Sequence, residues 1–326
     1  MKIVIRNEKI EDYNKIACIN YEAFHNWKKD NHFVKESLMV DVLRHNSLFD
    51  PELSLIAELE GEIVGHVLLS PFIFTMKGKE VKGAILGPIA VKPEHQKSGI
   101  GKLLIEKAHS VAENKGYQLS LLCGHPEYYP KFGYKTSMFA LSGCSAKIED
   151  ESLDLERYSE RPVETRDVEW ITEEWSKIHS EDELAIMPGK TIVDWSNHGS
   201  PCYNSMITKD DEILGFVRYQ LSDSIDVKEI LGNDESVTEM LKYLAVKLGD
   251  ESRSSLKIAL PFEKVSKIVE KDNSIVLEDA YATYAPFMIK PLGDENGVVT
   301  YCRDVELGKV KAGIISLPPV FDIEEC

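Results

Sequence analysis

Long apolar segments are missing from this sequence of 326 residues, and no run approaches the roughly 20 residues that a helix needs to cross a membrane. Charged residues enter at Lys2 and Arg6, too early for the apolar core of a secretion signal. The six cysteines are scattered, and none belongs to a Cys-x-x-Cys pair. We therefore expect a cytoplasmic protein with reduced thiols and no membrane partner.

Clusters of metal ligands and an excess of positive charge are also missing. No group of His, Cys or Asp residues has the spacing of a zinc site, so no metal is expected. The formal net charge is −17; residues 1–150 hold 19 of the 38 basic and 19 of the 55 acidic residues, so residues 151–326 carry the whole excess. This charge argues against a nucleic-acid partner, because phosphates would be repelled. It would attract a cationic substrate, although a merely soluble acidic surface explains it equally well.

The sequence does contain a glycine-rich turn between an apolar segment and an amphipathic one. Residues 84–91 are apolar and predict a buried strand. Residues 100–112 place apolar side chains on one face of a helix. Between them lies Gln96-Lys97-Ser98-Gly99-Ile100-Gly101. This order directs unpaired backbone N–H groups and the positive end of the helix dipole at one point, so it predicts a phosphate site.

The turn differs from the common nucleotide-binding loops. A single residue separates its glycines, no third glycine follows, and it lacks a Gly-Lys-Ser/Thr ending. A purely structural turn therefore remains an alternative. A second apolar segment at 118–123 predicts another buried strand, and it leads into Gly124-His125-Pro126-Glu127-Tyr128-Tyr129-Pro130-Lys131-Phe132-Gly133-Tyr134.

Together, these two motifs resemble those of the GNAT superfamily of acetyl-CoA-dependent N-acetyltransferases. Gln96, Gly99 and Gly101 match the family's Gln/Arg-x-x-Gly-x-Gly/Ala, which follows its fourth strand. Residues 129–134 match its Tyr-x-x-x-Gly-Phe/Tyr, which follows the fifth strand. The resemblance covers about residues 1–145 and implies an α/β fold with a mixed (α+β) sheet and acetyl-CoA as cosubstrate.

The resemblance also implies where acetyl-CoA is held. The amides of residues 97–102 would cradle its pyrophosphate, and the edge of strand 89–91 would pair with its pantetheine arm where the fourth strand splays from the fifth. The N–H near Ile89 would polarise the thioester carbonyl. The predicted cofactor-binding residues are Ile89, Ala90, Val91, Gln96, Lys97, Ser98, Gly99, Ile100, Gly101 and Lys102.

Tyr129 occupies the place of the family's general acid. A phenol keeps its proton at neutral pH, so Tyr129 would donate to the departing thiolate; a packing role is the alternative. His125 is a candidate base, although a histidine beside Gly and Pro is as often a turn residue. His66, Glu22 and Glu58 are weaker candidates, and water alone would also serve as the base.

Cys123 and His125 allow a rival interpretation, a thiol nucleophile with an adjacent base. Residues two apart on a strand point to the same face, so the two side chains would meet. No acid nearby would orient the histidine, however, and cysteine is commonly a small buried residue.

The second half of the chain repeats the pattern of the first. Residues 212–217 echo 62–67, a helix is predicted over 237–248 with a capping box at 236–239, and a strand over 256–260. We expect a second, degenerate copy of the fold, with an unrelated α+β domain as the alternative. The predicted divisions are a catalytic domain at 1–147, a linker at 148–166, the degenerate GNAT-like domain at 167–292 and a C-terminal segment at 293–326.

The second copy lacks the catalytic motifs. Asp234 and Glu235 stand where a phosphate would bind, and residues 261–264 contain no tyrosine. This half is therefore expected to shape the substrate cleft. Strands are predicted at 298–302 and 313–317, followed by an acidic tail at 320–326 that is disordered, packs on the surface or folds back near the cleft.

Two functions agree with these patterns. The first is an N-acetyltransferase that moves acetyl from acetyl-CoA to a primary amine of a small molecule or peptide. The second is a non-catalytic acyl-CoA-binding regulatory protein. The sequence does not select the acceptor amine, the acyl-chain length, the base or the oligomeric state.

Overall fold

The structure, a computed structural model, describes residues 3–25, 34–149, 152–196, 202–249, 255–293 and 297–321. The chain divides into two compact units. The first unit consists of residues 1–73, 81–138 and 285–310, and the second of residues 74–80, 139–284 and 311–326.

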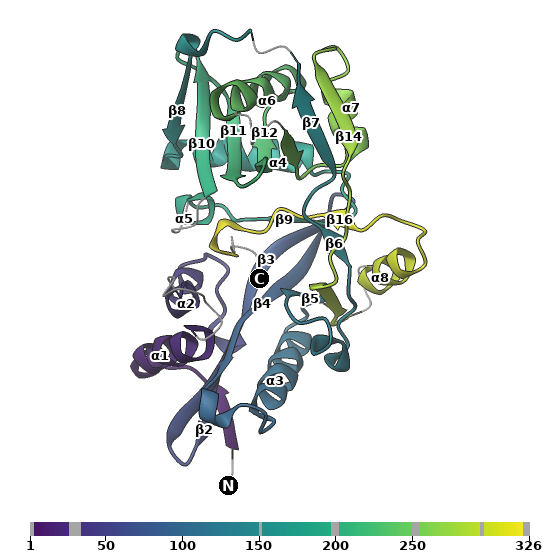
Figure 1. Ribbon diagram of the computed structural model, residues 1–326. Coiled ribbons are helices and arrows are strands. Elements are labelled where there is room, and N and C mark those ends of the chain that lie inside the picture. Colours follow the sequence, from purple (N-terminus) through teal and green to yellow (C-terminus); the bar gives the residue numbers. More distant parts are fainter. Residues whose placement is uncertain are drawn as a thin grey trace. The chain divides into compact units, whose positions relative to one another are not determined.

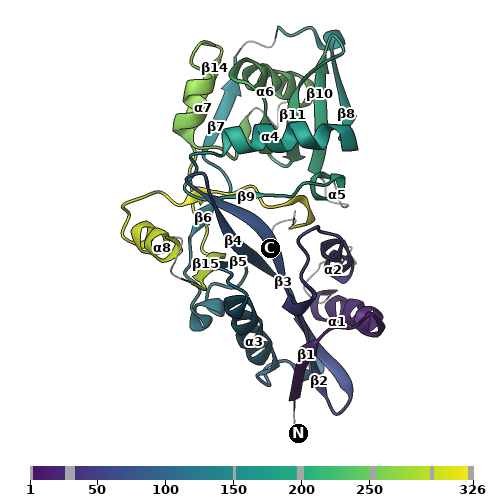
Figure 2. The same cartoon turned by 180° about the vertical axis from the view of Figure 1, so that it is seen from behind.

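The first unit is a mixed sheet in the order β1-β2-β3-β4-β5-β15. Helices α1 and α2 lie on one side of β3 and β4, and α3 lies on the other (Figures 1 and 2). The apolar face of α3, including Leu104 and Ala108, is fully buried against the sheet. The elements are β1 (Ile3–Asn7), α1 (Tyr13–Phe24), α2 (Glu36–Arg44), β2 (Ser54–Leu59), β3 (Glu62–Met76), β4 (Lys79–Val91), α3 (Ile100–Asn114), β5 (Leu119–Cys123), β15 (Phe287–Pro291) and α8 (Val298–Glu306).

The local predictions for this unit are confirmed. The apolar run at 84–91 lies within β4, the helix predicted from residue 100 is α3, and the run at 118–123 contains β5. Gly116, with a φ of 76°, follows the helix in the left-handed conformation that glycine adopts readily.

The second unit is a mixed sheet in the order β14-β7-β13-β12-β11-β10-β8, and a small parallel pair joins β6 to β16. Helices α4 and α6 cover opposite faces of the large sheet (Figures 1 and 2). The elements are β6 (Phe139–Ala140), β7 (Cys144–Ile148), β8 (Tyr158–Pro162), α4 (Val168–Ile178), β9 (Ala185–Met187), α5 (Ile192–Trp195), β10 (Cys202–Lys209), β11 (Glu212–Leu221), β12 (Ile225–Leu231), α6 (Asp234–Leu248), β13 (Leu256–Ile258), α7 (Phe262–Ile268), β14 (Ile275–Asp279) and β16 (Gly313–Ile314).

The two units repeat the same hairpin irregularity. In the β2–β3 and β10–β11 hairpins the register shifts next to a glycine, Gly65 in β3 and Gly215 in β11. A Cβ on Gly65 would lie 3.0 Å from Leu104 of α3, and one on Gly215 would lie 2.4 Å from Met240 of α6. Both glycines therefore let the following helix approach the sheet closely, which explains why the sequence repeats there.

Strand β1 of the first unit and strand β8 of the second are followed by the same hydrogen-bonded turn. Arg6 Nη1 donates to Asp12 Oδ2 at 2.6 Å, and Arg161 Nη1 donates to Asp167 Oδ2 at 2.7 Å. In each case the same carboxylate oxygen accepts the backbone N–H three residues earlier, at 2.9 Å and 2.8 Å. The pattern of the first unit is therefore repeated from β8 onward, and β8 lies within the segment 148–166 that was predicted to be a linker.

Each sheet takes one strand from the other half of the chain. The parallel pair β4–β5 is extended by antiparallel β15, which follows the second unit in sequence. The parallel pair β12–β13 is extended by antiparallel β7, which follows the first unit in sequence. The predicted boundaries after residues 147 and 292 therefore place β7 with the first unit and β15 with the second, the reverse of what the structure shows. The prediction grouped each strand with its neighbours along the chain.

Three further predictions are corrected. Residues 298–302 lie in the helix α8, because Val298, Tyr301 and Cys302 share one buried helical face. Helix α6 begins at Asp234 with Asn233 as its cap, ahead of the predicted capping box. Of the strand predicted at 313–317, β16 retains Gly313–Ile314. In the predicted tail, Phe321 is buried within a 3₁₀ turn, and residues 322–326 lie outside the described residues.

Across the described ranges, no helix is long and apolar enough to span a bilayer. The same ranges contain no group of three or more His, Cys, Asp or Glu side chains arranged to hold a metal ion.

Candidate active site

The turn before α3 exposes the first amides of the helix. Gly99 is the N-cap residue and has a φ of 90°, and Lys97 is also left-handed with a φ of 61°. Because the cap is glycine, no cap side chain accepts from the amides of the first helical turn. Those amides, at Ile100, Gly101 and Lys102, are where an anion binds at a helix N-terminus.

The polar side chains of the turn stabilise the turn itself. Ser98 Oγ donates to His95 O at 2.5 Å, and Gln96 Nε2 donates to Val91 O at 3.2 Å. Residues 96–99 are exposed, so the turn is open to solvent. Lys102, also exposed, has Glu106 Oε1 at 3.7 Å.

The two glycines of the turn have different roles. A Cβ on Gly99 would meet no atom within 4 Å, so glycine is required there by the left-handed backbone. A Cβ on Gly101 would lie 3.2 Å from Tyr128 Oη, so glycine is required there by close packing. Of the two, Gly99 faces open space and Gly101 faces Tyr128.

Strands β4 and β5 separate beside this turn. Their parallel ladder runs from the pair Gly83–Leu119 to the pair Ile85–Leu121, whereas β4 continues to Val91. The predicted coenzyme-binding segment of β4, residues 89–91, therefore lies beyond the ladder. Ala90 is buried, and its two neighbours are half-buried.

Tyr129 opens a 3₁₀ turn that follows β5 and is held from three sides. A Cβ on Gly124 would lie 2.5 Å from Tyr129 Cε2, so the ring packs directly on that glycine. The rings of Tyr128 and Tyr134 meet it edge-on, with centroids 5.1 Å and 5.9 Å away. Burial raises the pKa of Tyr129, so the phenol keeps its proton at neutral pH.

His125 is exposed and shapes the same turn through its backbone. Its carbonyl oxygen accepts from the N–H of Tyr128 at 3.0 Å and of Tyr129 at 3.4 Å. This agrees with the turn-residue interpretation, and a role as base stays a prediction. Cys123 is half-buried at the end of β5.

His66 is excluded as a base by its surroundings. It is completely buried in β3, with Nε2 3.1 Å from Ser54 Oγ and Nδ1 3.5 Å from Asn20 Nδ2. Burial and the charge of Arg44 lower its pKa to about 3, so it is a neutral core residue. Glu58, the other weak candidate on the sheet, accepts from Arg6 Nε at 3.1 Å.

A buried hydrogen-bond chain beside Tyr129 was not predicted from the sequence. It joins Ser120, Tyr134, His109 and Lys290. Two members could have been recognised from the sequence. Tyr134 belongs to the predicted motif, and His109 follows Ile105 by four residues on the buried face of α3. No pattern in the sequence indicates Lys290, because β15 reaches this sheet only through the strand exchange.

The corresponding turn of the second unit is closed to an anion. Asn233 Oδ1 accepts from the amide of Ser236 at 2.9 Å, and Asp234 and Glu235 occupy the first turn of α6. A phosphate would therefore meet a capped amide and two carboxylates. This supports the prediction that the copy does not bind coenzyme.

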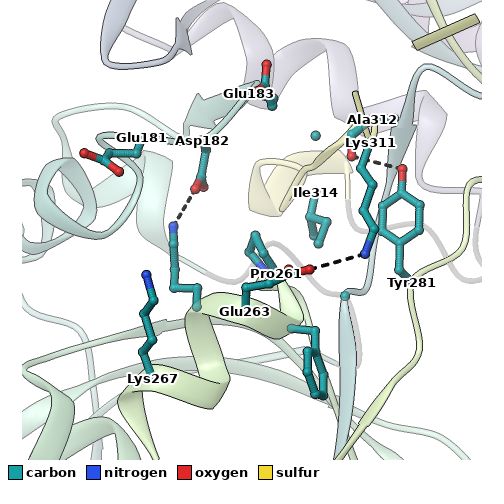
Figure 3. Close-up of a pocket in the computed structure, with 14 residues that line it drawn as sticks. Glu181, Asp182, Glu183, Pro261, Glu263, Lys267, Tyr281, Lys311, Ala312 and Ile314 are labelled. Atoms are coloured by element: carbon teal, nitrogen blue, oxygen red, sulfur yellow. Dashed lines mark hydrogen bonds and ion pairs between the residues drawn. The ribbon is translucent and has the colours of Figure 1, made fainter. Parts of the chain in front are cut away.

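The second unit contains a cavity of about 340 Å³ (Figure 3). Lys264 donates to Asp182 at its wall, Lys311 lies 3.6 Å from Glu263 Oε1, and the aromatic rings of Phe262 and Tyr281 line it. None of the predicted site residues lines this cavity, so it is separate from the predicted coenzyme site.

Buried histidines should make the two units respond oppositely to pH. In the first unit burial lowers the pKa of His66 and of His109 to about 3, so stability should fall as the pH drops below 6.5, where the unfolded chain takes up protons. In the second unit burial opposes the charged form of His179, but Glu229 and Asp182 raise its pKa to about 9. The contribution of charged His179 to the stability of the second unit is complete below pH 6.5 and is lost as the pH rises through 9.

Urea unfolding followed by tryptophan fluorescence tests this response in the second unit, because the ring of Trp175 lies 4.7 Å from that of His179. The slope between pH 6.5 and 9 should approach about 1.4 kcal/mol per pH unit. His179→Gln should remove the slope. A wild-type stability that does not change over this range would contradict the assignment.

Known proteins resemble this chain in sequence and fold. The family model for the acetyltransferase (GNAT) domain matches residues 4–137. The uncharacterized N-acetyltransferase YjhQ of Escherichia coli (strain K12) is 36% identical over 103 residues, which span 32% of this chain and 57% of that protein. The chain therefore covers little more than half the length of this curated relative.

Two solved structures share the fold across both units. A GCN5-related N-acetyltransferase from Kribbella flavida has a TM-score of 0.59 at 17% identity, covering 89% of this chain and 71% of its own. One from Anabaena variabilis ATCC 29413 has a TM-score of 0.62 at 12% identity, covering 90% of this chain and 73% of its own.

The matched family segment contains the glycine turn, the separating strands and Tyr129. The expected mixed-sheet fold is confirmed, and the similarity to the two solved structures covers 89% and 90% of this chain. Over residues 4–137 the chain is therefore similar to GNAT acetyltransferase domains.

Proposed function

We propose that the protein is an N-acetyltransferase that moves an acetyl group from acetyl-CoA to a primary amine of a small molecule or peptide. The observation that carries this proposal is the left-handed Gly99 at the start of α3, which leaves an open group of backbone donors beside two separating strands. A diphosphate fits such a group, because it is anionic and offers several acceptors.

In this proposal the first unit binds acetyl-CoA through its backbone. The amides of Ile100, Gly101 and Lys102 donate to the diphosphate, and exposed Lys97 adds positive charge. The pantetheine arm lies along residues 89–91, where β4 has left β5, and pairs with it as an added strand would. The N–H of Ile89 then polarises the thioester carbonyl.

Acetyl transfer in this site proceeds by direct attack. The neutral amine adds to the thioester carbonyl, the C–N bond forms, and the tetrahedral intermediate expels the thiolate of CoA. Tyr129 donates its phenolic proton to the thiolate and regains a proton that the new ammonium releases through water. The raised pKa of Tyr129 keeps this proton in place until the thiolate develops.

The acceptor is expected to be cationic. The formal charge of −17 belongs to residues 151–326, which make up most of the second unit, whereas the GNAT half is neutral. A field of this sign attracts polyamines, aminoglycosides or lysine-like amines and raises their rate of encounter.

Calorimetry and an amine screen test the proposed function. Wild-type protein should bind acetyl-CoA and release free CoA thiol with at least one amine. Gly99→Val should weaken acetyl-CoA binding at least about tenfold, because each charge-assisted hydrogen bond lost costs about 1.5–3 kcal/mol.

Gly116→Val is the matched control. Gly116 also has a positive φ and open space at its Cβ position, but it lies at the far end of α3. Both variants carry the same backbone strain, and only Gly99→Val should lose affinity. Tight binding without turnover of any amine would favour the acyl-CoA-binding regulator, and an unchanged affinity of Gly99→Val would refute the site.

A further inference from the structure

A hydrogen-bond chain connects β15 to the aromatic group around Tyr129. Ser120 of β5 and Lys290 of β15 are opposite each other in the antiparallel ladder, so their side chains share one face of the sheet. Ser120 Oγ lies 2.6 Å from Tyr134 Oη, which lies 3.0 Å from His109 Nε2. His109 Nδ1 in turn lies 3.0 Å from Lys290 Nζ.

Lys290 determines the direction of both hydrogen bonds that the His109 ring makes in this chain. An ammonium has only donors, so His109 Nδ1 must accept and the proton of the neutral imidazole must be on Nε2. Nε2–H then donates to Tyr134 Oη, whose other hydrogen-bond partner is Ser120 Oγ at 2.6 Å. Without Lys290 the other tautomer of His109 becomes available, and it would reverse the bond to Tyr134.

The hydrogen-bond chain from Ser120 to His109 is well protected from water. Ser120 is completely buried, and His109 and Tyr134 are each 3% exposed. Lys290 lies nearer the surface, where Glu113 Oε1 is 3.9 Å from its Nζ. In such surroundings an unmade hydrogen bond is costly, so the chain holds the ring of Tyr134 in one position.

The ring of Tyr134 packs against one side of the ring of Tyr129. The two rings meet edge-on, while Gly124 and Tyr128 hold Tyr129 from other sides. A shift of Tyr134 would therefore let the hydroxyl of Tyr129 move, and an error of about 1 Å in a reacting group costs up to about 100-fold in rate.

We propose that Lys290 is a positioning residue for acetyl transfer: it fixes the tautomer of His109, which holds Tyr134 and through it the general acid Tyr129. The proposal rests on the proposed function. It gives β15 a role in the reaction, beyond completing the sheet.

Kinetics of full-length variants test the role of Lys290. Lys290→Met should lower kcat about tenfold and change the KM for acetyl-CoA less than about twofold, because no member of the hydrogen-bond chain belongs to the turn at 96–101. Lys290→Arg keeps a donor and a positive charge and should retain most of the rate. Lys135→Met is the control: it breaks an exposed ion pair with Glu306, between the same two segments of the chain, and should leave kcat unchanged.

The pH profile separates a positioning role from a packing role. Lys290 faces His109, Glu113 and Glu106 of α3 and, through His109, Tyr134. Burial lowers the pKa of Lys290, so wild-type kcat should fall at high pH as its ammonium deprotonates. Lys290→Arg should move this fall to higher pH, and Lys290→Met should lack it. A residue that only packs would leave the profile unchanged.

Fluorine NMR of fluorotyrosine-labelled protein tests the same coupling without turnover. The resonance of Tyr129, assigned by its loss in Tyr129→Phe, should shift or broaden in Lys290→Met and stay in place in Lys135→Met. If the wild type acetylates no amine, the proposed function is wrong, and this resonance still decides whether Lys290 positions Tyr129. An unchanged resonance would overturn the inference, as would a wild-type kcat in Lys290→Met.

Discussion

A chain that ends after residue 147 is expected not to bind acetyl-CoA, because it lacks β15 of the first unit. β15 pairs with β5 over five residues, and its Met288 and Ile289 are completely buried. Burial of each such side chain contributes about 1.5–3 kcal/mol, and the ladder adds further stability. Together these losses approach the 5–15 kcal/mol that a folded domain typically has. Circular dichroism and calorimetry with acetyl-CoA would measure the outcome.

The control for this truncation restores β15 through a short linker that bypasses the second unit. The N–H of Met138 donates to Phe287 O at 3.0 Å, so a short flexible linker can join residue 138 directly to residue 285. Residues 1–138 fused in this way to 285–310 should fold and bind acetyl-CoA. Within the full-length chain, Met288→Asp should abolish binding, whereas Val299→Asp, at a 39% exposed site on α8, should not. If residues 1–147 bound acetyl-CoA as tightly as the whole chain, β15 would be dispensable.

Tyr129→Phe should lower kcat about 100-fold or more while acetyl-CoA binding stays the same, because a general acid contributes about 10²–10⁴ in rate. Phenylalanine preserves the ring that packs on Gly124 and against Tyr134, so the variant removes only the proton donor. Initial rates of CoA release, compared with calorimetric affinities, separate the two quantities.

Tyr128→Phe is the matched control for this prediction. Tyr128 precedes Tyr129 and packs edge-on against it, and its hydroxyl faces the Gly101 turn. Removal of that hydroxyl should affect acetyl-CoA affinity more than kcat. Equal kcat values for Tyr129→Phe and wild type would remove the general-acid assignment. Because burial raises the pKa of Tyr129, its ionisation should cause no loss of rate below pH 10.

The parts of the site that are local in sequence could be predicted from it. The turn at 96–101 lies between one strand and one helix, and apolar periodicity identifies both. Tyr129 follows β5 within one short segment. Such features depend on neighbours along the chain, so a single sequence contains the necessary information.

Features that depend on distant pairing could not be predicted in this way. Nothing in residues 287–291 indicates whether the strand joins the first sheet or the second, because an apolar strand fits either one. In 298–302, two valines and a threonine favour a strand by propensity, but burial of Tyr301 and Cys302 on one face gives a helix. The repeated spacing from Arg6 to Asp12 and from Arg161 to Asp167 is a signal in the sequence for the start of the repeat at β8.

The exchange of strands also fixes the order of events during synthesis. Translation adds about 5–20 residues per second, and domains normally fold as they leave the ribosome. Here completion of the N-terminal sheet must wait until Pro291 has emerged, long after β5 was made. During that interval the edge of β5 is open to wrong partners, so newly made chains should depend on chaperones until β15 arrives.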